Sequence, residues 1–247
     1  MVIGGKGGKL RPAVISIDED GTIDFEECGN KEGYDIREYP IGDFINGSLV
    51  LCGEKDCMVF DKIQQRKFDF MERGRISASL IKLNESHLWI TGGKTGLTYL
   101  SQGLKSTELI SINGAQESFN LPFTVYNHCM VKYSQSKALL IGGIQNKTRR
   151  SDKSWTIDLI DFNITEGPSL IKGRLKHVCG KINDDFGNTI IVAIGGQYEY
   201  SVEILNTTMM DEWKPGTYVN IHTDCALEFS VNHFTQLLLI FRTSITI

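Results

Sequence analysis

A run of apolar residues that ends at two small residues recurs along the chain, and this repeat limits the fold more than any other feature. Its clearest copies are "HLWITGGK" (87–94), "ALLIGGIQ" (138–145) and "TIIVAIGGQ" (189–197), with a shorter "MVIGGKG" at the start and a degraded "SLVLCGEK" at 48–55. The second small residues of these copies lie 48, 40, 50 and 53 residues apart. A last copy, "QLLLIFRT" (236–243), lacks the glycines. A period of this length predicts a repeat architecture.

Each period also contains three further short segments, with no amphipathic helical pattern between them. One precedes the glycine strand, as in "SASLIKLN" (77–84), "HCMVKYSQ" (128–135), "HVCGKIND" (177–184) and "CALEFSVN" (225–232). A variable loop, a third segment such as "STELISIN" and a fourth such as "EWKPGTYV" follow the glycines. Four short strands per period predict an all-β fold, a β-propeller with one four-stranded antiparallel blade per period.

The same segments make the chain resemble the kelch-repeat family. The matching pieces are the double glycines, the third strands "STEL", "WTIDL" and "SVEIL", Trp213 after the last of these, and the passage "GPSLIKGRLKHVCGKI". The resemblance covers nearly the whole chain and is clearest from about residue 85 to 219. It weakens where Cys52 and Gly53 replace the double glycine, and in the third and fourth periods, which lack the tryptophan. The resemblance implies a kelch-type propeller.

We expect one domain, residues 1–247, with about six blades of four antiparallel strands. The approximate periods are 1–46, 47–84, 85–134, 135–184, 185–232 and a partial 233–247. In this register the chain supplies three strands, then four full blades, then two strands, so the ring is expected to be incomplete at both ends. Because open sheet edges favour aggregation, we hypothesise that the chain is a fragment or an incomplete gene model.

The glycine pairs are interpreted as strand ends and not as phosphate-binding loops. A P-loop needs a glycine five positions before its Gly-Lys pair and a helix after it, but Leu88 and Ile3 occupy those positions and no helix pattern follows. Glycine tolerates positive φ and close backbone approach, which suits a tight turn. The structural repeat glycines are therefore Gly4, Gly5, Gly92, Gly93, Gly142, Gly143, Gly195 and Gly196.

The histidines and cysteines indicate no metal site and no cofactor. No HExxH motif and no paired CxxC motif occurs. The kelch resemblance implies that His128 and His177 hydrogen-bond between neighbouring blades. The cysteines on first strands, Cys129, Cys179 and Cys225, are expected to be buried free thiols. Cys52 and Cys57 flank a short loop and are a candidate disulfide.

Five N-x-[ST] sequons favour an extracellular protein over a cytoplasmic one. They lie mostly in predicted turns, where glycans are tolerated, although turns are rich in these residue types anyway. A signal peptide would then lie in a missing N-terminus. The candidate N-glycosylation sites are Asn46, Asn84, Asn146, Asn163 and Asn206.

Charge and hydropathy exclude two classes of partner. The net charge of -4 comes from 26 basic and 30 acidic residues spread along the chain, so no basic patch indicates nucleic acid. No apolar run approaches the roughly 20 residues of a membrane helix, so membrane insertion is not expected. The oligomeric state is left open.

The long loops between second and third strands are the expected binding region. These are "KTGLTYLSQGLKS" (94–106) and "IQNKTRRSDKS" (144–154), which in kelch-like propellers share a face with the blade-to-blade connections. Arginine and tyrosine frequently anchor interfaces, although any one of them can be a solvated loop residue. The predicted partner-binding residues are Arg75, Tyr99, Tyr126, Arg149, Arg150, Arg174, Tyr198 and Tyr200.

These features favour a non-catalytic module that binds a protein partner, with no catalytic residues. One alternative is the substrate-recognition propeller of a cullin ubiquitin-ligase adaptor whose BTB and BACK domains are missing from this chain. Another is a carbohydrate-active propeller enzyme, which would need carboxylates or metal ligands around the central channel, and the sequence supplies none at recognisable spacing.

Overall fold

The structure is a computed structural model that describes residues 2–4, 11–17, 23–27, 41–53, 57–60, 65–68, 71, 74–96, 101–146, 149–183 and 186–216. Throughout these ranges the regular secondary structure consists of β-strands, without a helix. It follows that no helix in the described part of the chain could cross a membrane. The all-β prediction is confirmed.

Four of the sheets contain four antiparallel strands each, and we call these sheets blades. The first blade contains β4 (Ile41–Ile45), β5 (Ser48–Cys52), β6 (Cys57–Phe60) and β7 (Gln65–Phe68). The second contains β8 (Ser79–Asn84), β9 (His87–Thr91), β10 (Ser106–Ser111) and β11 (Gly114–Asn120). The third contains β13 (Cys129–Lys132), β14 (Lys137–Ile141), β16 (Ser154–Asp158) and β17 (Ile164–Glu166). The fourth contains β18 (Val178–Asn183), β19 (Thr189–Ile194), β20 (Val202–Asn206) and β21 (Lys214–Pro215).

Two smaller sheets complete the described strands. Before the first blade, β1 (Val2–Gly4), β2 (Arg11–Ile17) and β3 (Ile23–Glu27) form a three-stranded antiparallel sheet. Between the second and third blades, β12 (Val125–Tyr126) pairs with β15 (Ile144–Gln145). The order of three strands followed by four four-stranded blades agrees with the prediction. The two strands expected after residue 224 lie outside the described residues.

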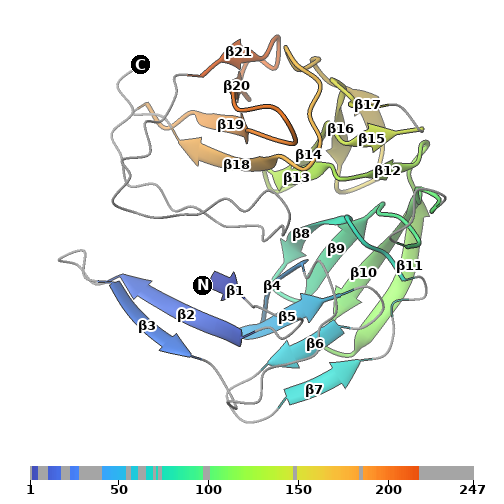
Figure 1. Ribbon diagram of the computed structural model, residues 1–247, viewed down its shortest axis with the longest axis vertical. Helices are drawn as coiled ribbons and strands as arrows, with labels where there is room; N and C mark the ends of the chain where they lie inside the picture. Colours follow the sequence, from blue (N-terminus) through green and yellow to red (C-terminus); the bar gives the residue numbers. More distant parts are fainter. Residues whose placement is uncertain are drawn as a thin grey trace.

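The blades follow one another in chain order around a ring, as in a β-propeller (Figure 1). The first strands of neighbouring blades contact each other, β4 with β8, β8 with β13 and β13 with β18. These strands therefore lie innermost, and each blade extends outwards from them. The described residues form a four-bladed, β-propeller-like arrangement, while the predicted six blades, incomplete ring and kelch type stay predictions.

The second strand of a blade is apolar over most of its length because both of its faces are buried. In β9, Leu88 and Ile90 pack into the core between the first and second blades, and Trp89 packs on the other side, between the second and third. In β14, Leu140 belongs to that second core and Leu139 to the core between the third and fourth blades. Successive side chains of a strand point to opposite faces, so a strand between two cores shows a continuous apolar run.

The glycine pairs end the second strands in a left-handed backbone conformation that fits the neighbouring blade closely. Gly142 has φ of 61° and Gly143 has φ of 83°. A Cβ on Gly142 would lie 2.7 Å from the carbonyl oxygen of Arg174. Both the φ value and the close approach require glycine, as predicted for a turn. The pairs at 92–93 and 195–196 also have positive φ, while Gly4 ends β1 and Gly5 lies outside the described residues.

Candidate binding site on the loop face

The two ends of the blades form two different faces. Antiparallel strands place the turns between first and second and between third and fourth strands at one end, which we call the turn face. The loops between second and third strands and the blade-to-blade connections lie at the other end, which we call the loop face. A hydrogen bond shows that a glycine turn and a blade-to-blade connection adjoin on the loop face: the amide of Gly143, after β14, donates to the carbonyl of Arg174 in the connection to the fourth blade at 2.7 Å.

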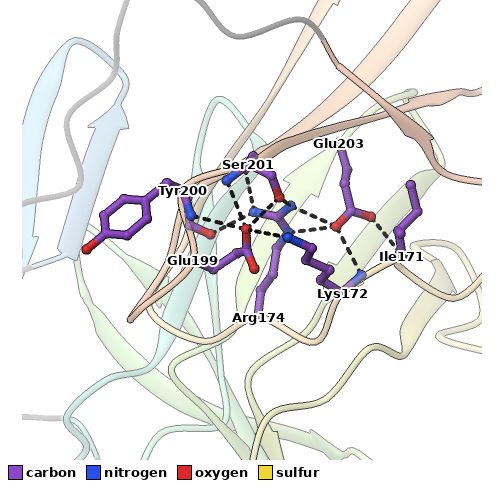
Figure 2. A network of polar contacts seen from close by, with 8 residues as sticks. Ile171, Lys172, Arg174, Glu199, Tyr200, Ser201 and Glu203 are labelled. Atoms are coloured by element: carbon purple, nitrogen blue, oxygen red, sulfur yellow. Dashed lines mark hydrogen bonds and ion pairs between the residues drawn. The ribbon is translucent and has the colours of Figure 1, made fainter.

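Arg174 lies on the loop-face connection before β18, but its side chain is buried inside the fourth blade. Its guanidinium donates to Glu203 Oε1 at 2.7 Å, to the carbonyl of Gly195 at 2.8 Å and to both the carbonyl and the hydroxyl of Ser201 (Figure 2). The second carboxylate oxygen of Glu203 accepts the amide of Ile171 at 2.7 Å. The network ties the connection, the glycine turn and the third strand together.

Arg75 repeats this network in the second blade. Its guanidinium donates to the carbonyl of Gly92 at 2.8 Å, to the carbonyl of Ser106 at 2.9 Å and to the carboxylate of Glu108. Arg75 and Arg174 are 3% and 0% exposed. Both arginines were predicted to lie on the partner-binding surface, whereas their side chains lie inside the blades and donate hydrogen bonds within the protein itself.

In the third blade, both members of this ion pair are replaced together. Val125 takes the position of Arg174. The carbonyl of Val125 accepts the amide of Gly93 from the preceding blade, as the carbonyl of Arg174 accepts the amide of Gly143. Trp155 takes the position of Glu203. The amide of Gly142 donates to the carbonyl of Lys153, two residues before Trp155, and the amide of Gly195 donates to the carbonyl of Ser201, two residues before Glu203. Trp155 stacks on Phe123 and donates its indole hydrogen to Gln145 Oε1 at 3.1 Å. A valine and a tryptophan thus occupy in the third blade the positions that an ion pair occupies in the second and fourth blades.

Five side chains on the loop face of the third and fourth blades form an exposed group, which we call the exposed loop cluster. Tyr198 and Tyr200 are 72% and 78% exposed, and Ile171 is 53% exposed. The guanidinium of Arg150 lies 5.8 Å from the centre of the Tyr198 ring, and Lys172 forms an ion pair with Glu199. The cluster consists of Arg150, Ile171, Lys172, Tyr198 and Tyr200.

Glu199 fixes the loop that carries the two tyrosines. Its Oε1 accepts the amides of Tyr200 and Ser201 at 3.1 and 3.0 Å, the Ser201 hydroxyl at 2.7 Å and Lys172 Nζ at 3.3 Å. The Ser201 hydrogen bonds, followed by the Lys172 charge, lower the pKa of Glu199 to about 2. The carboxylate is therefore ionised at neutral pH. The ring of Tyr200 points away from the hydrogen bonds of Glu199 (Figure 2).

The loop face continues towards the second blade with further cations. Lys94 Nζ lies 5.8 Å from the centre of the Tyr126 ring. Partial burial and the charge of Lys176 lower the pKa of Lys94. Two cations are thus held near each other, at an electrostatic cost that a bound anionic group would offset.

The other three predicted binding residues are Arg149, Tyr126 and Tyr99. Arg149 is exposed, next to Arg150 in the loop between β14 and β16. Tyr126 is half-buried in β12, and Tyr99 lies outside the described residues. Sequence analysis missed Ile171, Lys172, Lys94 and Lys176, although "IKGRLK" and "GGKTG" carry all four. In "IKGRLK" the side chain of Arg174 turns inwards, whereas Ile171 and Lys172 are exposed.

Both buried histidines lie at blade boundaries. His128 Nε2 and Thr91 Oγ1 of the preceding blade are 2.9 Å apart, which confirms the predicted inter-blade hydrogen bond for His128. For His177 the prediction is wrong, since neither ring nitrogen has a hydrogen-bond partner among the described residues. The position of Thr91, directly before the glycine pair of the preceding blade, is taken here by Ile141, whose side chain cannot form a hydrogen bond. Burial lowers the pKa of each histidine to about 3, so both are neutral.

Four cysteines form two disulfides. Cys52 and Cys57, opposite each other on β5 and β6, are joined within the first blade. Cys129 and Cys179 are joined across the third and fourth blades, between the inner strands β13 and β18. The expectation of free thiols is therefore wrong for these two, because the inner strands of neighbouring blades lie side by side. Cys225 lies outside the described residues.

Fold and site together define an all-β, propeller-like protein whose loop face gathers exposed aromatic and basic side chains. No protein-family model matches the chain, and a search of curated proteins finds no significant match. Within the described ranges, no three His, Cys, Asp or Glu side chains come together in a group that could hold a metal ion.

Proposed function

We propose that this protein is a non-catalytic, kelch-like β-propeller module that binds a protein partner through its loop face. The observation that carries the proposal is the exposed loop cluster. Its two tyrosines and Ile171 are largely exposed, yet the buried Arg174–Glu203 network and the Glu199 hydrogen bonds hold the backbone beneath them. Exposed aromatic side chains on a fixed backbone lose little conformational entropy on binding, which favours an interface.

The charge of the loop face favours an acidic segment of the partner. Arg150 lies near the Tyr198 ring, Lys172 pairs with Glu199 beside Tyr200, and Arg149 is exposed next to Arg150. Lys94 and Lys176 lie further along the same face. Arginine can bind a carboxylate with two parallel hydrogen bonds, and tyrosine adds apolar area with a polar end. We therefore propose that the partner presents Asp or Glu side chains beside an apolar residue.

The two disulfides favour an oxidising compartment. Disulfides persist in secreted and extracellular proteins and are rare in the cytosol, where thiols are kept reduced. Cys129–Cys179 and Cys52–Cys57 therefore support the extracellular expectation from the sequons. They also argue against the cullin-adaptor alternative, which would place the chain in the cytosol.

A displayed library of random peptides tests the proposal. Selection on the wild-type protein should enrich peptides that contain Asp or Glu next to an aromatic or aliphatic residue. The double variant Arg150→Glu, Tyr200→Ala reverses one charge and removes one aromatic ring at exposed positions, so the fold should be kept. We expect the selected peptides to bind this variant at least tenfold more weakly, because each lost contact of this kind is worth about 1 to 2 kcal/mol.

The matched control is the double variant Ile160→Ala, Met209→Ala, which changes two residues of the turn face that are 80% and 67% exposed. This variant should bind the selected peptides as tightly as the wild type does. Equal binding to the wild type and to the loop-face variant would contradict the proposal.

A further inference from the structure

Four of the five sequons lie on the turn face, opposite the exposed loop cluster, and the asparagines of three of them are exposed. Asn46 is in the turn between β4 and β5, Asn84 ends β8 at the turn to β9, and Asn163 is in the turn between β16 and β17. The amide of Asn46 donates to the carbonyl of Glu85 at 2.9 Å, which places the first two turns side by side. All three turns lie at the same end of their blades.

The third turn lies on the same face of the next blade. The amide of Leu159 donates to the carbonyl of Ser136, in the turn between β13 and β14, at 2.7 Å. Phe162 of the same turn packs on Phe119, with ring centres 4.5 Å apart. The backbone of the turn is thus held in place, while the side chain of Asn163 is exposed.

The side chains of all three asparagines are exposed, so a sugar attached to them would project into solvent. Exposed apolar residues adjoin two of them: Phe44 lies two residues before Asn46, and Ile160, 80% exposed, lies three residues before Asn163. A glycan is bulky and solubilising, and it would cover these apolar side chains. Attachment is therefore sterically allowed at all three asparagines, and at Asn46 and Asn163 a glycan would also shield apolar surface.

The other two sequons differ in position or burial. Asn206 also lies on the turn face, but it is half-buried. Asn146 is on the loop face, where its Oδ1 accepts the amide of Thr124 at 3.2 Å. A glycan at Asn146 would lie beside Arg149 and Arg150. Neither residue belongs to the proposed set.

We propose that the protein carries N-linked glycans at Asn46, Asn84 and Asn163, so that the turn face is glycosylated and the loop face stays bare. In this reaction the asparagine amide nitrogen bonds to C1 of an oligosaccharide carried on a lipid pyrophosphate. The bond from C1 to the pyrophosphate oxygen breaks, the lipid pyrophosphate leaves, and the amide gives up one proton. The two disulfides, an observation independent of the sequons, match the oxidising compartment where this transfer occurs. The proposal does not depend on the protein partner.

The test is secretion of the full chain, with a signal peptide fused to it, from a eukaryotic host. Treatment with peptide N-glycosidase in ¹⁸O-labelled water converts each glycosylated asparagine into a labelled aspartate, which peptide mass spectrometry locates. We expect label at all three asparagines. Each of the variants Asn46→Gln, Asn84→Gln and Asn163→Gln should lower the mass of the intact secreted protein by one glycan.

Asn113 supplies a matched control. It is exposed in the β10–β11 turn of the second blade, on the same face, but Ala115 stands where a sequon needs Ser or Thr. Asn113 should stay unlabelled in the wild type and become labelled in the variant Ala115→Ser. Label at Asn113 of that variant without label at the three proposed sites would overturn the proposal. So would label confined to Asn146.

Discussion

At the scale of single residues, the buried arginines show how one residue type can serve the fold and not the surface. Arg174 and Glu203 are both almost completely buried and share two hydrogen bonds, from Nε at 3.0 Å and Nη2 at 2.7 Å. A buried ion pair stabilises little compared with a good apolar substitute, but removing one partner leaves an uncompensated charge. The third blade, with Val125 and Trp155 in the same places, shows that the fold accepts either solution.

The variant Arg174→Met should therefore lower the free energy of unfolding by about 3 to 5 kcal/mol, because Glu203 is left buried and unpaired. The double variant Arg174→Met, Glu203→Leu should be more stable than this single variant. Urea denaturation of the wild type, both single variants and the double variant measures the coupling. A double variant whose loss equals the sum of the two single losses would show that the pair is not coupled.

His128 and His177 should make the protein less stable in mild acid. Their folded pKa values of about 3 lie below the ordinary value of 6.5, so between these values the unfolded chain binds protons that the folded chain excludes. The contribution of the two neutral histidines to stability is thus fully present above pH 6.5 and is lost as the pH falls towards 3. The loss at pH 5 should be about 2 kcal/mol for each histidine.

The variant His177→Asn should remove about half of this pH dependence. Unfolding free energies at pH 7 and pH 5 measure it, and Glu199 adds little in this window, because a carboxyl with the ordinary pKa of 4.5 is still mostly ionised at pH 5 in the unfolded chain. An unchanged pH dependence in the variant would mean that His177 is protonated in the folded protein.

At the scale of elements, the disulfide between β13 and β18 links two blades covalently. It closes a loop of 50 residues, whereas Cys52–Cys57 closes one of 5 within a single hairpin. In the chain-entropy account, a longer closed loop removes more freedom from the unfolded chain. The inter-blade bond should therefore contribute more to stability than the hairpin bond.

We expect the double variant Cys129→Ala, Cys179→Ala to lose about 4 kcal/mol, and Cys52→Ala, Cys57→Ala to lose about 2 kcal/mol. Denaturant unfolding under non-reducing conditions measures both losses. A larger loss from the hairpin pair would rule out loop closure as the source of the stabilisation.

The strands of this protein could be predicted from its sequence, whereas the partners of several side chains could not. Runs such as 87–91 and 137–141 are strand-sized and end at glycine pairs, so β9 and β14 follow from local pattern. The pairing of Cys129 with Cys179 depends on which strands adjoin around the ring, and a list of cysteines does not give connectivity. The same holds for Arg75 and Arg174, because sequence placed their backbone on the loop face but not the direction of their side chains.

At the scale of the whole molecule, antiparallel blades give the protein two faces with different chemistry. The loop face presents Arg150, Tyr198 and Tyr200, and the turn face presents four sequons, two of them beside exposed apolar residues such as Ile160. The sequence could predict which loops share a face, because strand order determines it. It could not predict which loop residues stay exposed, because that depends on packing between blades.

Hydrogen–deuterium exchange of the protein with and without a selected acidic peptide tests the two-face account most directly. The account predicts slower exchange on binding at residues 149–152, 171–174 and 197–201 of the loop face, and no change at 44–48, 83–87 and 159–163 of the turn face. Protection at the turn-face segments, with none on the loop face, would contradict it.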